Sequence, residues 1–311
     1  MKKHEAADIL LSKDNILIVT HKIPDGDTLG SAAALCSALR RAGKTAYMYP
    51  NPQITDKFIP YVGKFIAPES FEPAYTVAVD VAADDMLCIG FSSAVDLCID
   101  HHPSNPEFGA LNLIEPDMSS SGEIILEIIE SMNTGLSPEE ADLLYIALST
   151  DTGCFRHGNT NSHSFNSAAK LYDSGADVYS INTSFFKKAT RGRIKLESMI
   201  NSGMELYRDG KIAIAKVTLK MLEDAGATED DCDSLAELPS RVDTELLAVV
   251  IRELKDGSSK ISLRSDEGID STLISARFGG GGHKMASGCT IMAAPEEAEK
   301  QLLAVIDEVW K

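Results

Sequence analysis

The chain has 311 residues, with 47 acidic residues against 29 basic ones and a formal charge of −18 at pH 7. This balance excludes a broad basic face for long nucleic acid, because such binding depends on neutralising many phosphates. The composition is 44% hydrophobic and 24% charged, as in globular proteins, and the length favours about two domains. No uncharged apolar run approaches the roughly 18 residues that a membrane span needs, so we expect no membrane association.

The sequence favours a cytoplasmic location. The first residues lack the long apolar stretch of a secretory signal. The six cysteines form no Cys-x-x-Cys pair, and most of them lie among apolar residues, where free cysteine behaves as a small hydrophobic side chain.

Strand and helix patterns alternate through the first two-thirds of the chain. Short apolar runs that predict buried strands lie at residues 15–20, 46–49, 75–80 and 94–100. Patterns that predict helices lie at residues 29–42, 122–132 and 138–149, the last of them starting with a capping box. This alternation predicts an α/β fold whose N-terminal domain is a mainly parallel β-sheet flanked by helices.

The character of the chain changes at residues 187–195, which hold five positive charges in an otherwise acidic protein. We therefore place a first domain at residues 1–186, a short linker at 187–203 and a smaller C-terminal α/β domain at 204–311. Within the second domain, strands are predicted at residues 211–218, 245–252, 260–264 and 288–292, and helices at 270–278 and 295–310.

Side chains that can ligate metals are concentrated in four short segments. Three of these segments follow predicted strands, and sites in open α/β sheets form where strands end. The fourth follows a predicted helix, and the sequence alone does not show how it reaches the others. The first segment holds His21, Asp25 and Asp27, and the second is Asp80. The third is Asp100-His101-His102, and the fourth is Asp151-Thr-Gly153.

These residue types suit a divalent metal centre. Imidazole together with several carboxylates suits Mn²⁺, and the carboxylates also suit Mg²⁺. A shared carboxylate can bridge two ions roughly 3.5–4 Å apart, and such a pair lowers the pKa of water and stabilises the attacking and leaving oxygens of phosphoryl transfer.

The same segments carry a family resemblance. His21-x3-Asp25-x-Asp27, Val79-Asp80, Asp100-His101-His102 and Asp151-Thr-Gly153 resemble the four motifs of the DHH phosphoesterase family. Gly279-Gly-Gly-Gly-His283 with Ala286-Ser-Gly288 resembles the signature of the DHH-associated C-terminal domain. The length and the short linker are most similar to the NrnA-like subgroup of oligoribonucleases and 3'-phosphoadenosine 5'-phosphate (pAp) phosphatases.

The resemblance implies a role for each matching residue. Two divalent ions would be bound, with Mn²⁺ as the first expectation and Mg²⁺ as the alternative. Asp80 would bridge them and take part in catalysis, Asp100 would orient the neighbouring histidine, and His102 would contact the phosphate or assist the leaving group. The other ligands would be His21 and Asp25 for one ion and Asp27, His101 and Asp151 for the second.

Substrate contacts are expected from the glycine run and from arginines. Glycines cost about 1 kcal/mol each in a helix or strand interior, whereas in a loop they let backbone N–H groups approach an anion. The resemblance implies that Gly280, Gly281, Gly282 and His283 hold the phosphate or terminal nucleotide in an active-site cleft between the two domains. Arginine is a natural bidentate partner of phosphate, and the candidates are Arg264, Arg277 and Arg156.

Together these expectations describe a phosphoesterase that hydrolyses short oligoribonucleotides to 5'-mononucleotides and pAp to AMP and phosphate. The reaction would proceed by in-line attack of a metal-bridging hydroxide. The partners would be short single strands or small nucleotides rather than long duplexes, and the resemblance is compatible with a homodimer. Two alternatives stay open: a phosphodiesterase for cyclic di-AMP or pApA, and a nucleotide-binding sensor without catalysis.

Overall fold

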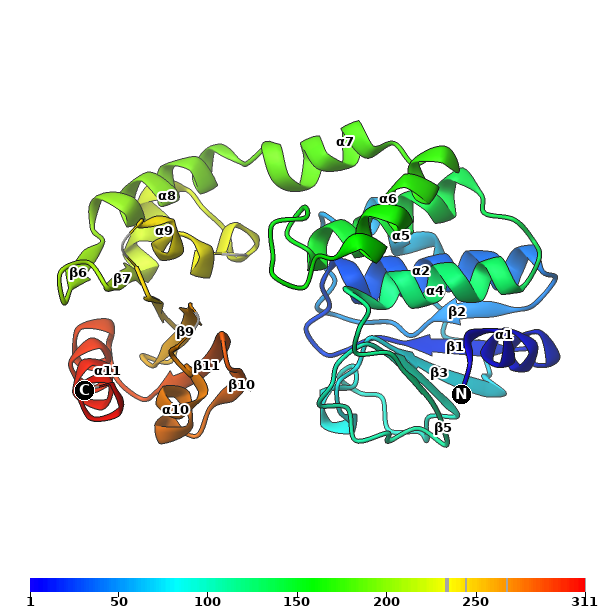
Figure 1. The fold of residues 1–311 in the computed structure, drawn as a ribbon, viewed down its shortest axis with the longest axis horizontal. Helices are drawn as coiled ribbons and strands as arrows, with labels where there is room; N and C mark the ends of the chain where they lie inside the picture. Colours follow the sequence, from blue (N-terminus) through cyan, green and yellow to red (C-terminus); the bar gives the residue numbers. More distant parts are fainter. Residues whose placement is uncertain (233–234, 244, 267, 311) are drawn as a thin grey trace. The chain divides into compact units, whose positions relative to one another are not determined.

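A computed structural model of the chain describes residues 1–232, 235–243, 245–266 and 268–310 (Figure 1). The chain divides into two compact units, Met1–Lys188 and Ala189–Lys311, and each unit has hydrophobic clusters of its own. Among the described residues, the helices are too short or too polar to cross a membrane.

The first unit is built on a five-stranded parallel sheet in the order β2-β1-β3-β4-β5. Its strands are β1 (Ile16–Val19), β2 (Ala46–Met48), β3 (Tyr75–Val79), β4 (Leu97–Asp100) and β5 (Leu111–Ile114). Its helices are α1 (Lys3–Ser12), α2 (Gly26–Arg41), α3 (Ile59–Val62), α4 (Ser121–Ser131), α5 (Pro138–Asp151), α6 (Ser162–Asp173) and α7 (Val178–Asn182). The predicted parallel sheet flanked by helices is therefore confirmed.

The central strands of the sheet are buried because they are mostly apolar. All residues of β1 and β3 are buried, as expected for parallel strands covered by helices rather than exposed on one face. The neighbouring order of β1, β3 and β4 places the ends of these three strands side by side at one edge of the sheet.

Small residues let α2 and α5 pack closely. A Cβ atom on Gly26 would lie 2.3 Å from Oγ1 of Thr150, and a Cβ atom on Gly30 would lie 2.3 Å from the carbonyl oxygen of Leu143. The first turn of α2 therefore lies against the last turn of α5, so the two helices run in opposite directions. This packing carries Asp151, the last residue of α5, to the start of α2.

The second unit is a six-stranded mixed sheet in the order β10-β11-β9-β8-β7-β6, in which only the β7–β8 pair is parallel among the described residues. Its strands are β6 (Glu205–Tyr207), β7 (Ile212–Val217), β8 (Leu247–Glu253), β9 (Ser259–Ser265), β10 (Gly281–His283) and β11 (Ala286–Ile291). Its helices are α8 (Arg191–Ser202), α9 (Leu219–Ala225), α10 (Thr272–Ser275) and α11 (Pro295–Val309).

Two parts of the second unit differ from the sequence-based expectation. The segment predicted as a linker contains α8, whose Leu196 and Ile200 are buried. The glycine run was predicted as an open loop, but Gly281–His283 form an edge strand paired with β11. Pairing with a neighbouring strand offsets the poor intrinsic strand preference of glycine.

Candidate metal centre

The fold brings all four predicted ligand segments of the first unit together. His21 follows β1, Asp80 follows β3, and Asp100 ends β4. Because these strands are neighbours in a parallel sheet, their carboxyl ends meet at one edge. Asp151 is the last residue of α5, and it lies near the other segments because α5 packs closely on α2.

One cluster of ligand atoms is formed by His21, Asp25 and Asp80, with all three atoms within 4.8 Å of one another. Nε2 of His21 lies 3.7 Å from Oδ1 of Asp25 and 3.8 Å from Oδ2 of Asp80. Asp25 also caps α2, because its carboxylate accepts hydrogen bonds from the backbone N–H groups of Asp27 and Thr28.

A second cluster is formed by Asp27, His101 and Asp151. Nε2 of His101 lies 3.8 Å from Oδ2 of Asp27, 3.8 Å from Oδ2 of Asp151 and 3.6 Å from Oδ1 of Asp80. Asp80 therefore offers one oxygen to each cluster, as a bridging carboxylate would.

His101 is oriented for ligation by its other ring nitrogen. Nδ1 of His101 lies 3.1 Å from the carbonyl oxygen of Met118, so this nitrogen carries the proton and donates. In the neutral ring this leaves Nε2 free to ligate on the side that faces the carboxylates, an arrangement common among histidines that bind metals.

Burial and mutual repulsion perturb the carboxylates. Burial and the charges of Asp27 and Asp25 raise the pKa of Asp80 well above its ordinary value, and the same causes raise the pKa of Asp151. Burial also raises the pKa of Asp27, although the nearby His101 acts in the opposite direction. A divalent cation among these groups would replace repulsion by attraction, so the donor set fits Mg²⁺ or Mn²⁺.

His102 forms a third, overlapping group of possible ligand atoms with Asp80 and His101, and it is held by Asp100. Its Nδ1 lies 2.8 Å from Oδ1 of Asp100 and 3.8 Å from Oδ1 of Asp80. Asp100 is fully buried and is fixed in turn by the backbone N–H of His101 and by Nδ2 of Asn105. Burial lowers the pKa of His102, but the hydrogen bond and charge of Asp100 outweigh it, so the pKa is raised overall.

The predicted substrate arginines lie in three different environments. Nε of Arg156 donates to the carbonyl oxygen of Gly153, so the side chain is folded onto the turn that follows Asp151. Arg264 is half-buried in β9, and burial lowers its pKa. Arg277 is exposed and lies 3.9 Å from Glu308, an arrangement typical of a surface side chain.

The glycine run is positioned by its neighbour β11. A Cβ atom on Gly280 would lie 2.1 Å from the carbonyl oxygen of Gly288, and Gly282 has φ +139°, so both positions require glycine. Arg264 pairs with Ala286, which pairs with His283, so these three positions lie in one row across β9, β11 and β10. The side chain of His283 lies outside what the structure describes.

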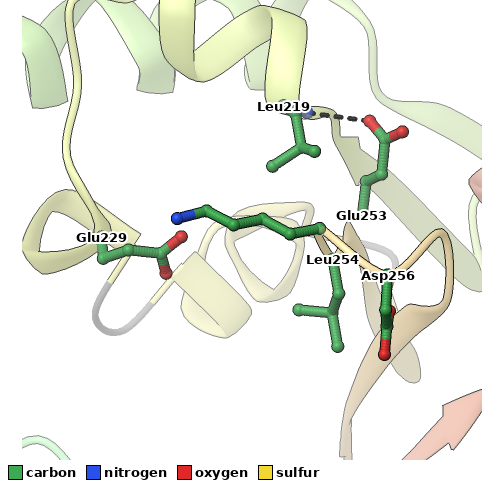
Figure 2. Close-up of a pocket in the computed structure, with 6 residues that line it drawn as sticks. Leu219, Glu229, Glu253, Leu254 and Asp256 are labelled. Carbon is green, nitrogen blue, oxygen red and sulfur yellow. Dashed lines mark hydrogen bonds between the residues drawn. The ribbon is translucent and has the colours of Figure 1, made fainter.

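A hollow of about 360 Å³ in the second unit contains none of the predicted residues (Figure 2). Its acidic groups already have partners, because Glu253 accepts a hydrogen bond from the backbone N–H of Leu219 and Glu229 pairs with Arg252. The lining residues are Leu219, Glu229, Glu253, Leu254, Lys255 and Asp256. We assign no chemistry to this hollow.

Several residues that support the ligands were not predicted. Ser121 donates its hydroxyl to Oδ1 of Asp80, and Asn159 donates its amide to Oδ2 of Asp151. The N–H groups of Ser121 and Gly122, at the start of α4, both donate to Asp27. A serine at a helix start or an asparagine in a loop is too common for its sequence context alone to have indicated these contacts.

The fold and the centre define an α/β protein suited to hold divalent metal ions where its parallel strands end. Residues 15–148 match the DHH family, N-terminal domain, and residues 209–311 match the DHHA1 domain. The chain therefore contains a DHH family N-terminal domain and a DHHA1 domain, and the resemblance based on its sequence motifs is confirmed.

Characterised relatives span nearly the whole chain. It is 29% identical to the bifunctional oligoribonuclease and PAP phosphatase NrnA of Thermus thermophilus, covering 100% of this chain and 95% of that protein. It is 26% identical to the cyclic-di-AMP phosphodiesterase GdpP of Geobacillus thermodenitrificans, covering 99% of this chain but 49% of that protein. Both relatives are, by name, hydrolases of phosphoester bonds.

Solved structures share the fold. An exopolyphosphatase-related protein from Bacteroides fragilis gives a TM-score of 0.89 at 23% identity, covering 98% of this chain and 96% of that one. RecJ of Thermus thermophilus in complex with Mn²⁺ gives a TM-score of 0.54 at 14% identity, covering 98% of this chain and 54% of that one.

Proposed function

We propose that the protein is a phosphoesterase, dependent on two divalent metal ions, that hydrolyses short oligoribonucleotides to 5'-mononucleotides and pAp to AMP and phosphate. The observation that carries the proposal is the pair of ligand clusters joined by Asp80, which belongs to the first cluster and lies 3.6 Å from His101 of the second. It is supported by the relative from Thermus thermophilus, because this chain covers 95% of that oligoribonuclease and PAP phosphatase.

The ligand clusters divide the metal-binding residues. His21 and Asp25 would hold one ion, Asp27, His101 and Asp151 would hold the other, and Asp80 would be shared. Mn²⁺ is the first choice because each cluster combines imidazole with carboxylates. When bound, such a pair of ions lowers the pKa of water and offsets charge on phosphoryl oxygens.

The chain's own residues orient the reacting groups. Asp100 holds the His102 ring by a 2.8 Å hydrogen bond, and we assign to His102 the contact with a phosphate oxygen or with the leaving group. A buried carboxylate that fixes an imidazole in this way removes rotational freedom before the substrate arrives.

Substrate recognition is assigned to the second unit and to Arg156. The row formed by Arg264, Ala286 and His283 supports the assignment of Arg264 and His283, with Gly280, Gly281 and Gly282, to the phosphate or terminal nucleotide. Arg277 is the least supported of the predicted contacts, since it is exposed and faces Glu308.

A substrate panel in Mn²⁺ tests the proposal. It compares an RNA dinucleotide, an RNA 24-mer, pAp, pApA and cyclic di-AMP, with Asp80→Asn as the inactive control. Fast turnover of the dinucleotide and pAp, and slow turnover of the 24-mer, are expected. Preference for cyclic di-AMP would instead favour the activity named for the Geobacillus relative, and stoichiometric nucleotide binding without turnover would favour a sensor.

A further inference from the structure

A single turn, Met118–Gly122, contacts several of the proposed ligands. The N–H groups of Ser121 and Gly122 donate to the two oxygens of Asp27 at 2.7 and 2.9 Å. The Ser121 hydroxyl donates to Oδ1 of Asp80 at 3.0 Å. The turn therefore fixes both the position and the rotation of the Asp27 carboxylate.

The same turn reaches the other two ligands of this cluster. The carbonyl oxygen of Met118 accepts from Nδ1 of His101 at 3.1 Å. Nδ2 of Asn159 donates to the carbonyl oxygen of Ser119 at 3.0 Å and to Oδ2 of Asp151 at 3.1 Å. Every member of the cluster of Asp27, His101 and Asp151 is thus tied to this turn, directly or through Asn159.

Glu123 holds the turn in place. It is buried in the first turn of α4, and its Oε2 accepts the backbone N–H of Ser119 at 2.7 Å. Its Oε1 accepts the Ser167 hydroxyl at 3.2 Å and lies 2.7 Å from Nδ1 of His163, so the carboxylate also connects the turn to α6. A buried carboxylate whose two oxygens are both engaged tolerates little displacement.

The first cluster is held differently. The carboxylate of Asp25 accepts hydrogen bonds from the start of its own helix α2, and His21 directly follows β1. Asp80 contacts the turn but is also fixed by its backbone N–H, which donates to Ile99 of the neighbouring strand. Movement of the turn should therefore affect the second cluster more than the first.

We propose that Glu123 is a positioning residue that sets the affinity of one metal position, the one formed by Asp27, His101 and Asp151, by fixing the Met118–Gly122 turn. This inference rests on the proposed function for the identity of the metals, and its main readout is metal binding. Residues that orient metal ligands typically change metal affinity by about 10–100-fold when they are altered.

The chain provides a matched control for Glu123. Glu127, one helical turn further along α4, binds Nε2 of the same His163 at 2.9 Å and pairs with Lys3 on α1. The described contacts of Glu127 do not include the Met118–Gly122 turn. A substitution of Glu127 therefore tests what the loss of a His163 contact, together with the Lys3 ion pair, does without a change at the turn.

The experiment measures Mn²⁺ binding to the full chain by electron paramagnetic resonance of free Mn²⁺. It compares the wild type with Glu123→Asp, Glu123→Gln and Glu127→Asp. Aspartate keeps the charge but is too short to reach the N–H of Ser119, whereas glutamine keeps an acceptor oxygen at the right length. We expect Glu123→Asp to weaken one of two Mn²⁺ sites by about 10–100-fold, and Glu123→Gln and Glu127→Asp to stay within about three-fold of the wild type.

The outcomes separate the proposal from its premises. Unchanged affinity at both sites in Glu123→Asp, or equal weakening by Glu127→Asp, overturns it. Loss of the circular dichroism spectrum of folded protein in both Glu123 variants also overturns it, because Glu123 would then be a general structural residue. If wild-type protein binds Mn²⁺ but hydrolyses no substrate of the panel, the proposed function fails while the comparison of Mn²⁺ affinities still stands.

Discussion

Asp80 combines an uncommon backbone conformation with a central place among charged groups. Its φ is +59°, in the left-handed region that Asn and Asp adopt more readily than other residues with side chains. Its side chain is buried and is shared by both ligand clusters. The backbone turn at the end of β3 is therefore what directs this carboxylate between the two positions.

Substitution of Asp80 by asparagine should have opposite effects with and without metal. Asparagine keeps the size and tolerates the positive φ, so it removes the charge alone. Without metal, the loss of repulsion should raise the melting temperature in EDTA, because burial and neighbouring carboxylates already raise the pKa of Asp80. With Mn²⁺ at 100 times the wild-type Kd, the stabilisation of about 2.7 kcal/mol expected for the wild type should be lost.

Differential scanning fluorimetry in EDTA and in Mn²⁺ measures both effects, and Asp84→Asn in an exposed turn is the control. A variant that melts below the wild type in EDTA, yet keeps the Mn²⁺-induced rise, would contradict the assignment of Asp80 as a shared ligand.

Residue types indicated the metal-binding side chains but not the residues around them. Histidine and aspartate at strand ends are informative because few other roles place several of them together. Glu123, Ser121 and Asn159 escape such reasoning, because their importance depends on contacts between segments far apart in sequence. Arg156, Arg264 and Arg277 were named as phosphate contacts from their residue type, but only the fold defines their surroundings.

At the scale of elements, the strands that carry the site were predictable from the sequence. The edge strand β5 and the packing of α5 on α2 were not. The runs at residues 15–20 and 75–80 are mostly apolar, which matches the full burial of β1 and β3. The β5 strand was missed because it is short and only one of its residues is buried. The approach of α5 to α2 depends on Gly26 and Gly30, and no spacing rule shows which helix those glycines will meet.

The pairing of α2 with α5 depends on a buried glutamate. Glu140 is 0% exposed and accepts hydrogen bonds from the Ser137 N–H and the Ser37 hydroxyl, and it pairs with Arg41 of α2 at 2.7 Å. Glu140→Ala leaves these donors without their acceptor and should lower the free energy of unfolding by about 2–3 kcal/mol.

Glu139→Ala is the matched control. Glu139 is half-exposed and pairs with Lys64, which is also exposed, so its loss should cost less than about 1 kcal/mol. Urea unfolding followed by circular dichroism measures both variants. Equal destabilisation by the two substitutions would contradict the importance assigned to the buried contact.

At the scale of the whole molecule, the chemistry is divided unequally between two units. Every metal-ligating residue proposed here lies in Met1–Lys188. The second unit has its own hydrophobic clusters, with Ala298, Leu302 and Ile306 of α11 buried at intervals of four residues. The first unit ends at Lys188, within the basic stretch at residues 187–195.

This division predicts where metal binding will stabilise the protein. Hydrogen exchange followed by mass spectrometry, without substrate, should show that Mn²⁺ at 100 times its Kd slows exchange in β1, β3 and the start of α4. For amides that exchange through unfolding of the whole unit, the slowing should reach about 100-fold, since binding to the folded form shifts that equilibrium by the same factor. Peptides from β7, β8 and β9 should be unchanged, and Asp80→Asn should abolish the protection. A ligand slows exchange only in the part of the protein that must be folded for the ligand to bind. Equal protection of β7–β9 by Mn²⁺ alone would therefore contradict the assignment of all metal ligands to the first unit.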